Sequence, residues 1–332
     1  MPAKRPIAAL TLLAASAVVL AGCSATTAAP AEPAGTTPPA EAVVEVEDNA
    51  GIQTVPAEPS SVVALDNRTF ETLSDWGVEL SAAAVALMPD TIAYTEDDSI
   101  VDIGNHREPN LELIVAADPD LVISGQRFWD RDADIAALVP DATILQLEPR
   151  EGEPLDEELR RQVTVLGEVF GKQAEAEQLV ADLDAAIARA ADAYDASQTV
   201  MAVTTTGGEI GYLAPSVGRT LGPIFDVLGL TPALVVDGST DDHQGDDISV
   251  EAIADSNPDW ILVMDRDAAV GADDPSFSPA ADILEGSEAL AGVTAVQEDN
   301  LVYMPADTYT NESIQTYTEF LDAFADALEG AR

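Results

Sequence analysis

The sequence predicts an α/β protein: two α/β lobes with mainly parallel sheets, joined by one long helix, with a ligand cleft between the lobes. Three observations predict this arrangement. Strand-like apolar runs alternate with helical segments along the chain, which is typical of parallel sheets. A helix-then-strand template occurs twice. A segment with helical periodicity, from Leu155 to about Tyr194, lies between the two copies and is expected to span both lobes.

The two template copies lie 139 residues apart and share a capping residue, a glutamate, a proline and an arginine at identical spacing: Asn110, Glu112, Pro119 and Arg127, then Ser249, Glu251, Pro258 and Arg266. Asparagine and serine favour a helix N-cap, and a first-turn glutamate suits the helix dipole. Proline is expected to end each helix. The apolar runs Leu121–Ile123 and Trp260–Met264 are predicted to be strands buried on both faces.

Each template arginine follows its predicted strand, where ligands collect in open α/β sheets. A single arginine at such a place would more often be a surface salt-bridge partner. The repeated spacing instead favours Arg127 and Arg266 as partners that face one cleft and hold an anion.

The N-terminal segment predicts export and lipidation. Residues 1–22 have a basic start and a short apolar run, which predicts a signal peptide. Leu20-Ala21-Gly22-Cys23 resembles a bacterial lipobox, so we expect a lipid on Cys23, the only cysteine. Residues 23–46, rich in Ala, Thr, Pro and Glu, are predicted to be a disordered tether. No other segment is apolar enough to span a bilayer.

The predicted elements follow in order along the two lobes. In the N-terminal lobe, residues 47–160, they are strand 61–66, helix 69–76, a loop or short strand at 92–103, the first template, helix 135–139 and strand 142–147. Residues 161–195 form the linking helix, which Gly171 is placed to divide. In the C-terminal lobe, residues 196–332, they are strand 199–204, a second strand at 212–213, helix 221–228, the second template, helix 281–290, strand 301–304 and helix 313–328.

Composition excludes several function classes. The chain has 14 lysines and arginines against 61 acidic residues, a net charge of −47, so we expect no nucleic-acid partner. Its only histidines are His106 and His243, too few for a zinc site of several histidines. No nucleophile–base pair and no phosphate-loop, dinucleotide-binding or Gly-x-Ser-x-Gly motif is present. We therefore expect no enzyme and no permanently bound cofactor.

Further polar and aromatic residues are predicted near strand ends and in loops. Trp129 lies two residues beyond Arg127, and Arg219 precedes the predicted helix at 221–228. His243 lies in an acidic loop, and Tyr309 follows the predicted strand at 301–304. Taken singly, a loop histidine is usually solvated and a loop aromatic usually packs against its neighbours.

Residues 45–330 resemble the substrate-binding lipoproteins of iron–siderophore ABC importers, with two lobes joined by one rigid helix. The resemblance rests on the following segments: Val62–Asp66 with Glu71–Leu73, Glu108–Glu112 with Pro119–Val122, and Ile248–Glu251 with Asn257–Asp259. Further segments are similar to the branch that binds catecholate siderophores: Ile123–Arg127, Gly218-Arg219 before Asp226–Gly229, His243, Val263–Arg266, and Pro305 with Tyr309. One departure is Thr310-Asn311-Glu312-Ser313, which replaces the usual glycine-rich stretch.

The resemblance implies roles for these residues. Arg127, Arg219 and Arg266 would bind an anionic ferric catecholate, with Trp129 beside them. His243 and Tyr309 would complete the coordination of iron when the siderophore is tetradentate, and this fits because Fe(III) is a hard acid that accepts phenolate oxygen and imidazole nitrogen. Glu112 and Glu251 would dock arginines of the permease dimer, although first-turn helix stabilisation explains them equally well. The expected protein is a monomer, lipid-anchored outside the cytoplasm.

Other interpretations remain open. The same fold would also suit haem, cobalamin or a hydroxamate siderophore, although three arginines disfavour neutral ligands. An extracytoplasmic hydrolase and a purely structural surface lipoprotein are the remote alternatives.

Overall fold

The two template copies occupy equivalent places in two five-stranded sheets of the computed structural model, which describes residues 42–331. The first sheet has the order β5-β4-β3-β6-β7, and every neighbouring pair is parallel. Its strands are β3 (Val62–Ala64), β4 (Ala82–Ala83), β5 (Val101–Asp102), β6 (Leu121–Ser124) and β7 (Thr143–Gln146). We call this sheet and its helices the first lobe.

The second sheet has the order β10-β9-β8-β11-β12. Its strands are β8 (Val200–Thr206), β9 (Glu209–Tyr212), β10 (Asp246–Asp247), β11 (Trp260–Asp265) and β12 (Leu301–Tyr303). Strand β11 is parallel to β8 and β12, whereas β9 and β10 extend the sheet in antiparallel fashion. We call this sheet and its helices the second lobe. Two α/β lobes with mainly parallel sheets confirm the predicted fold class.

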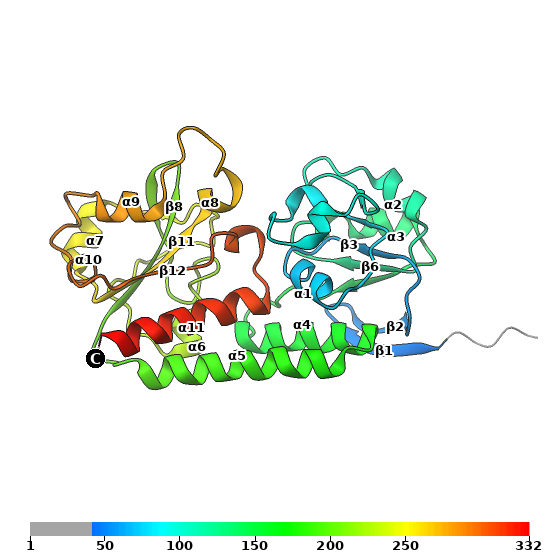
Figure 1. The fold of residues 1–332 in the computed structure, drawn as a ribbon, viewed down its shortest axis with the longest axis horizontal. Helices are drawn as coiled ribbons and strands as arrows, with labels where there is room; N and C mark the ends of the chain where they lie inside the picture. Colours follow the sequence, from blue (N-terminus) through cyan, green and yellow to red (C-terminus); the bar gives the residue numbers. More distant parts are fainter. Residues whose placement is uncertain (1–41, 332) are drawn as a thin grey trace, which may run out of the picture. The chain divides into compact units, whose positions relative to one another are not determined.

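The helices fill the connections between these strands (Figure 1). The first lobe has α1 (Phe70–Asp75), α2 (Leu111–Ala117) and α3 (Asp132–Leu138), with 3-10 turns η1 (Val85–Leu87), η2 (Ala93–Glu96) and η3 (Trp129–Arg131). The second lobe has α6 (Ile224–Leu228), α7 (Val250–Ser256), α8 (Arg266–Val270), α9 (Ala280–Glu285), α10 (Thr294–Gln297), the 3-10 turn η4 (Thr308–Thr310) and α11 (Ile314–Gly330). Helix α9 is shorter than the predicted helix at 281–290, because the chain turns at Gly286.

The template helices begin as predicted. The side chain of Asn110 accepts a hydrogen bond from the amide of Glu112, and that of Ser249 accepts one from the amide of Ala252. Both helices end two residues before the proline, at Ala117 and Ser256. Asp118 and Asn257 adopt left-handed conformations, with φ of 47° and 42°. A residue before proline is disfavoured in the right-handed helical region, and Asp and Asn tolerate the left-handed one.

The aspartate after each template proline ties its strand to the first strand of the same sheet. The carboxylate of Asp120 accepts hydrogen bonds from the amides of Ser60 and Ser61, at 2.7 and 3.1 Å. That of Asp259 accepts one from the amide of Thr199 at 2.7 Å and one from its hydroxyl at 3.0 Å. Equivalent carboxylates therefore set the starting points of β6 and β11.

The helical segment between the lobes is divided at Gly171. Helix α4 (Leu155–Phe170) ends where Gly171 takes a φ of 66°, a left-handed conformation that glycine adopts without strain. Helix α5 (Gln173–Ala193) then packs against both α4 and α11 (Figure 1). Helix α11 is anchored in turn by Phe324, whose ring meets that of Trp260 on β11 edge-on at 5.8 Å.

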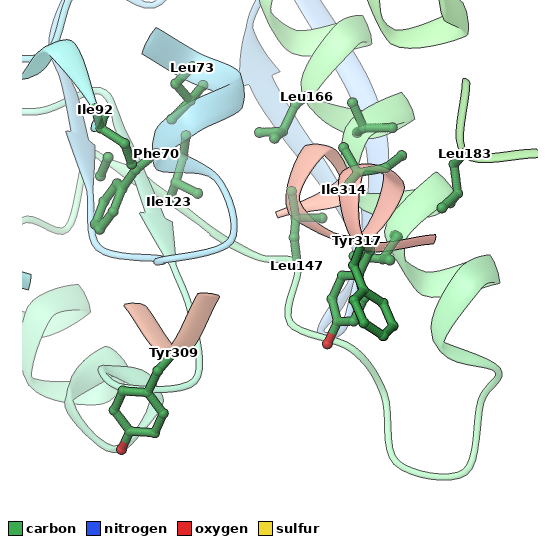
Figure 2. Packing of buried hydrophobic residues seen from close by; sticks show 14 of the residues in the cluster. Phe70, Leu73, Ile92, Ile123, Leu147, Leu166, Leu183, Tyr309, Ile314 and Tyr317 are labelled. Carbon is green, nitrogen blue, oxygen red and sulfur yellow. The ribbon is translucent and has the colours of Figure 1, made fainter. Parts of the chain in front are cut away.

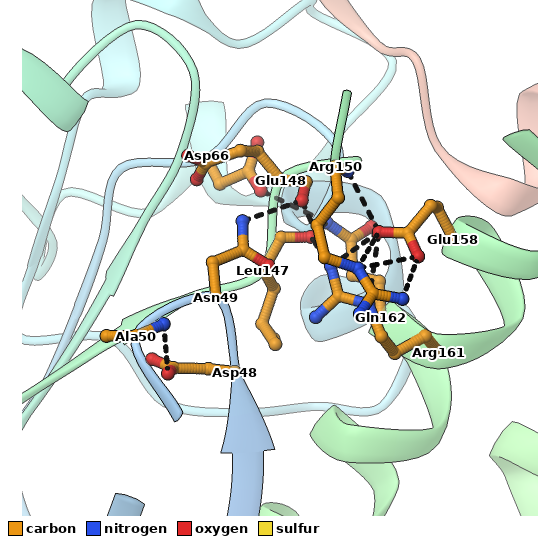
Figure 3. A network of polar contacts seen from close by, with 10 residues as sticks. All are labelled: Asp48, Asn49, Ala50, Asp66, Leu147, Glu148, Arg150, Glu158, Arg161 and Gln162. Atoms are coloured by element: carbon orange, nitrogen blue, oxygen red, sulfur yellow. Dashed lines mark hydrogen bonds and ion pairs between the residues drawn. The ribbon is translucent and has the colours of Figure 1, made fainter. Parts of the chain in front are cut away.

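A buried polar network joins the exit of β7 to the start of α4 (Figure 3). The buried carboxylate of Glu158 accepts hydrogen bonds from Arg150 at 2.6 Å and Arg161 at 2.7 Å. Burial alone would raise its pKa, but these bonds outweigh it and lower the pKa to about 2. Gln162 donates to Asp66 at 3.1 Å and so connects α4 to the segment that follows β3.

The disordered tether predicted for residues 23–46 includes residues that form a strand in the structure. Strand β1 (Val43–Asp48) pairs in antiparallel register with β2 (Gly51–Pro56), and Val46 and Val55 are buried in the core. Valine and glutamate alternate over residues 44–47, which is the period of a strand with one buried face. The residues before 42, including the predicted signal peptide and Cys23, lie outside the described part. Within residues 42–331, no helix is long and apolar enough to cross a membrane.

Candidate ligand-binding site

Two arginines of the site follow equivalent strands. Arg127 lies three residues beyond β6, after Gly125, and Arg266 begins α8 directly after β11. A glycine is required at position 125 because the backbone there passes close to the side chain of Asp66. A Cβ atom at this position would lie 2.3 Å from the Cγ of Asp66. Asp265 caps α8 by accepting a hydrogen bond from the amide of Ala268 at 3.0 Å. Both arginines therefore leave their sheets at the carboxyl edge.

A third arginine comes from the loop between β9 and α6. Arg219 precedes Thr220, whose φ of 66° is unusual for a β-branched residue. The hydroxyl of Tyr317 on α11 donates a hydrogen bond to the carbonyl of Thr220 at 3.3 Å, and Thr220 is itself buried. This constrained turn directs Arg219 inward, and its side chain is 10% exposed.

The three arginines converge on Tyr309 of η4. Their guanidinium carbons lie 5.6 Å (Arg127), 5.2 Å (Arg219) and 4.6 Å (Arg266) from the centre of its ring. These distances fall within the range of cation–π attraction. Arg127 comes from the first lobe and the other two come from the second. Figure 2 shows Tyr309 with its hydroxyl directed away from the labelled core residues Phe70 and Ile123.

A buried carboxylate partly balances this positive cluster. Glu312, 3% exposed, pairs with Arg68 of the first lobe at 2.9 Å and with Arg219 at 3.0 Å. The hydroxyl of Thr220 donates to its other oxygen at 2.6 Å. Burial by itself would raise the pKa of Glu312, but Arg219 and Arg68 lower it to about 2.

Several donors of the cluster lack an internal partner. Among the described residues, the Nε atoms of Arg219 and Arg266 are buried without a hydrogen-bond acceptor. Arg127 donates only a long bond, 3.4 Å, to the carbonyl of Tyr309. Burial and the nearby charge of Arg219 lower the pKa of Arg127. Buried N–H groups without partners are costly, so an anion placed here would supply the missing acceptors.

His243 lies apart from the tight cluster, in the exposed loop between Thr240 and Gly245. Its charge interacts with that of His106 in the first lobe. His106 is partly buried, and burial, Arg127, Arg107 and His243 all lower its pKa. Within residues 42–331, its Nδ1 atom is buried without a partner. The chain's two histidines therefore come from different lobes and lie within electrostatic range of each other.

Three other predicted residues are solvent-accessible. Trp129 is 60% exposed at the start of η3. Glu112 and Glu251 are both exposed, in the first turns of α2 and α7. No group of three or more His, Cys, Asp or Glu side chains among the described residues is arranged to hold a metal ion by itself.

A separate cavity of about 680 Å³ lies beside α8. Its lining comes from both lobes and includes Thr91, Asp90, Asp273 and Asp307. Thr91 donates a hydrogen bond to Asp307 at 2.6 Å across the lobes. The lining is acidic and contains none of the three arginines, so this cavity does not suit an anion.

Sequence reasoning missed Arg68, Glu312 and His106 as parts of this region. Arg68 and Glu312 are 244 residues apart in the chain and meet only through the fold. One signal was available for Glu312, because it lies three residues after Tyr309, which the sequence already placed in the site. For His106, the signal was its rarity, as one of two histidines in the chain.

The chain is similar to known binding proteins in sequence and in fold. The chain is 25% identical to the petrobactin-binding protein YclQ of Bacillus subtilis over 83% of this chain and 84% of YclQ. It is 27% identical to the ferric-anguibactin-binding protein FatB of Vibrio anguillarum over 79% and 80% of the two chains. The crystal structure of YclQ, 22% identical by structural alignment, matches with a TM-score of 0.73 over 87% and 99%.

A TroA-like periplasmic binding protein from Xylanimonas cellulosilytica matches with a TM-score of 0.70 and 28% identity, over 88% of this chain and 99% of that one. Residues 62–308 match the periplasmic binding protein family. That range contains both template copies and all three arginines of the cluster, and it ends at Thr308, the first residue of η4. The chain belongs to the periplasmic binding protein family.

Proposed function

We propose that this protein captures a ferric catecholate-type siderophore outside the cytoplasm and delivers it to an ABC import permease. The observation that carries the proposal is the convergence of three guanidinium groups, from two lobes, within 5.6 Å of one tyrosine ring. Catecholate oxygens on Fe(III) leave a net negative complex, and arginine offers permanently charged donors in a fixed geometry. The relatives that bind petrobactin and ferric anguibactin support the same class of ligand.

Tyr309 and His243 are proposed to complete the iron coordination of a tetradentate siderophore. Such a ligand leaves two positions open, and a phenolate oxygen and an imidazole nitrogen suit them. Tyr309 already lies among the three arginines, within 5.6 Å of each guanidinium carbon. His243, on its exposed loop, would approach as the ligand settles between the lobes.

The surroundings of the site fit a delivery role. Glu112 and Glu251 start the two template helices, both are exposed, and they are proposed to contact basic side chains of the permease dimer. The lipobox-like sequence at Cys23 supports a membrane anchor through lipid. A monomer with these two acidic contacts would present one lobe to each half of the permease.

Titration of the purified protein with a ferric bis-catecholate tests the proposal, with tryptophan fluorescence and the visible iron band as readouts. Trp129 is 60% exposed, whereas Trp76 and Trp260 are buried, so quenching should come mainly from Trp129. The variant Trp129→Phe, which removes this reporter, is the control. Tight quenching with a shifted iron band would support both the ligand class and direct ligation. Quenching without a shift would remove His243 and Tyr309 as ligands, and no response would favour haem, cobalamin or a hydroxamate.

A further inference from the structure

Glu312 lies where the two lobes and the arginine cluster meet. One of its carboxylate oxygens, Oε2, accepts hydrogen bonds from Arg68 of the first lobe at 2.9 Å and from Arg219 of the second at 3.0 Å. The other oxygen accepts the bond from Thr220. Arg219 therefore faces two ways, toward the Tyr309 ring and toward Glu312.

The net positive charge that the arginine cluster presents to a ligand depends on the Glu312 carboxylate. Arg127 has no carboxylate partner among the described residues, and Arg266 has only the looser contact with Asp267 at 3.7 Å. Arg219 shares the charge of Glu312 with Arg68. Because Glu312 is 3% exposed, solvent screens its charge weakly, and its effect reaches the ligand.

We propose that Glu312 is a specificity-determining residue that lowers the positive charge of the anion site, so that the site prefers a ferric complex with a small negative charge over one with a large negative charge. The inference rests on the proposed function. A ferric bis-catecholate is a monoanion and a ferric tris-catecholate is a trianion, so a carboxylate beside the site penalises the second more than the first. Repulsive elements of this kind are a general source of specificity.

Glu312 also holds Arg219 and Arg68 in place, and this structural role must be separated from the charge role. Loss of positioning would weaken every anionic ligand by a similar factor. Loss of charge would change the ratio of affinities for the trianion and the monoanion. The ratio is therefore the informative quantity.

The experiment measures dissociation constants of the purified protein for a ferric bis-catecholate and a ferric tris-catecholate, in wild type and Glu312→Gln. Both arginines bond to the same oxygen of Glu312, so a glutamine oxygen placed there keeps both contacts. The affinity ratio should shift toward the trianion by about tenfold or more at low salt, and by less at high salt.

Glu71→Gln is the matched control. Glu71 of α1 accepts bonds from Asn311 at 2.9 Å and Ser313 at 2.5 Å, both to its Oε2 atom. It therefore secures the same segment, without an arginine partner among the described residues. This variant loses one negative charge and should keep the wild-type ratio within about twofold.

A second variant should shift the affinity ratio in the opposite direction. Arg68→Gln leaves Glu312 with Arg219 alone, so the site becomes less positive and the ratio should shift toward the monoanion. This variant keeps the Glu312 carboxylate and removes one of its arginine partners, so it tests whether the net charge of the Arg68–Glu312 pair changes the affinity ratio. Equal weakening of both complexes, or an unchanged ratio in both variants, would overturn the role of Glu312. A wild-type protein that binds neither complex would instead overturn the proposed function.

Discussion

Arg266 is the arginine nearest to Tyr309, and its removal should have a large and measurable effect on ligand affinity. Its guanidinium carbon lies 4.6 Å from the ring centre, and its Nε atom is buried without an acceptor among residues 42–331. The variant Arg266→Ala removes this charge and these donors from the site. We expect weaker binding of the ferric bis-catecholate with little change in stability.

The magnitude follows from the geometry. A ligand group placed at the Tyr309 ring would lie at a similar distance from the Arg266 charge, whose guanidinium carbon is 4.6 Å from the ring centre. At an effective dielectric constant of about 30, one charge pair at this distance contributes ~2 kcal/mol. That free energy corresponds to about a 30-fold increase in the dissociation constant. The side chain of Arg266 is 21% exposed, so a dielectric constant between those of the interior and of water is appropriate.

Fluorescence titration at low and high salt is the assay, and Arg189→Ala is the control. Arg189 also carries one positive charge, but it pairs with Asp322, Asp326 and Glu329 on the outer surface, so its loss should leave affinity unchanged. If Arg266→Ala binds within about threefold of wild type at low salt, the electrostatic account of the site is wrong.

Three further predictions concern stability, pH and iron coordination. Asp259→Ala removes two hydrogen bonds to Thr199 and should lower the free energy of unfolding by ~2 kcal/mol in a urea titration; an effect under about 0.5 kcal/mol would refute the strand-anchoring role. The pKa of Glu312 is lowered to about 2. The stabilisation that ionised Glu312 gives the fold is therefore present above its unfolded pKa, near 4.3, and is lost as pH falls toward 2. The difference in unfolding free energy between wild type and Glu312→Gln should close over that pH range, and a constant difference would contradict this. His243→Ala and Tyr309→Phe should each weaken a tetradentate ferric ligand more than a hexadentate one; equal loss for both would exclude direct iron ligation.

The repeated spacing predicted the central feature of the site. The template predicts that Arg127 and Arg266 follow equivalent strands, and in the structure both approach Tyr309. The prediction works because the two template helices have the same length and the same turn before proline, which are local properties. Equal spacing then places two side chains at the same edge of two related sheets.

What sequence reasoning missed depends on contacts between distant parts of the chain. The antiparallel addition of β9 and β10 depends on which sheet edge is free, and short strands carry little periodicity. The pairing of Glu312 with Arg68 joins residues 244 positions apart. In a chain with 61 acidic residues, one particular glutamate cannot be recognised as buried from composition. Glu312 becomes buried only when both lobes pack around the segment that follows η4.

The net charge of −47 gives a final prediction about association kinetics. A protein of this charge repels an anionic complex at long range, whereas the arginine cluster attracts it only at short range. Raising salt from about 20 to about 200 mM shortens the screening length from roughly 20 to roughly 7 Å, which weakens the long-range repulsion first. The association rate constant of the ferric bis-catecholate should therefore rise with salt, by about twofold or more, while the dissociation rate constant also rises. Stopped-flow fluorescence separates the two rates. An association rate constant that falls with salt would contradict this prediction. It would mean that the arginines attract the anionic complex at long range more strongly than the acidic surface repels it.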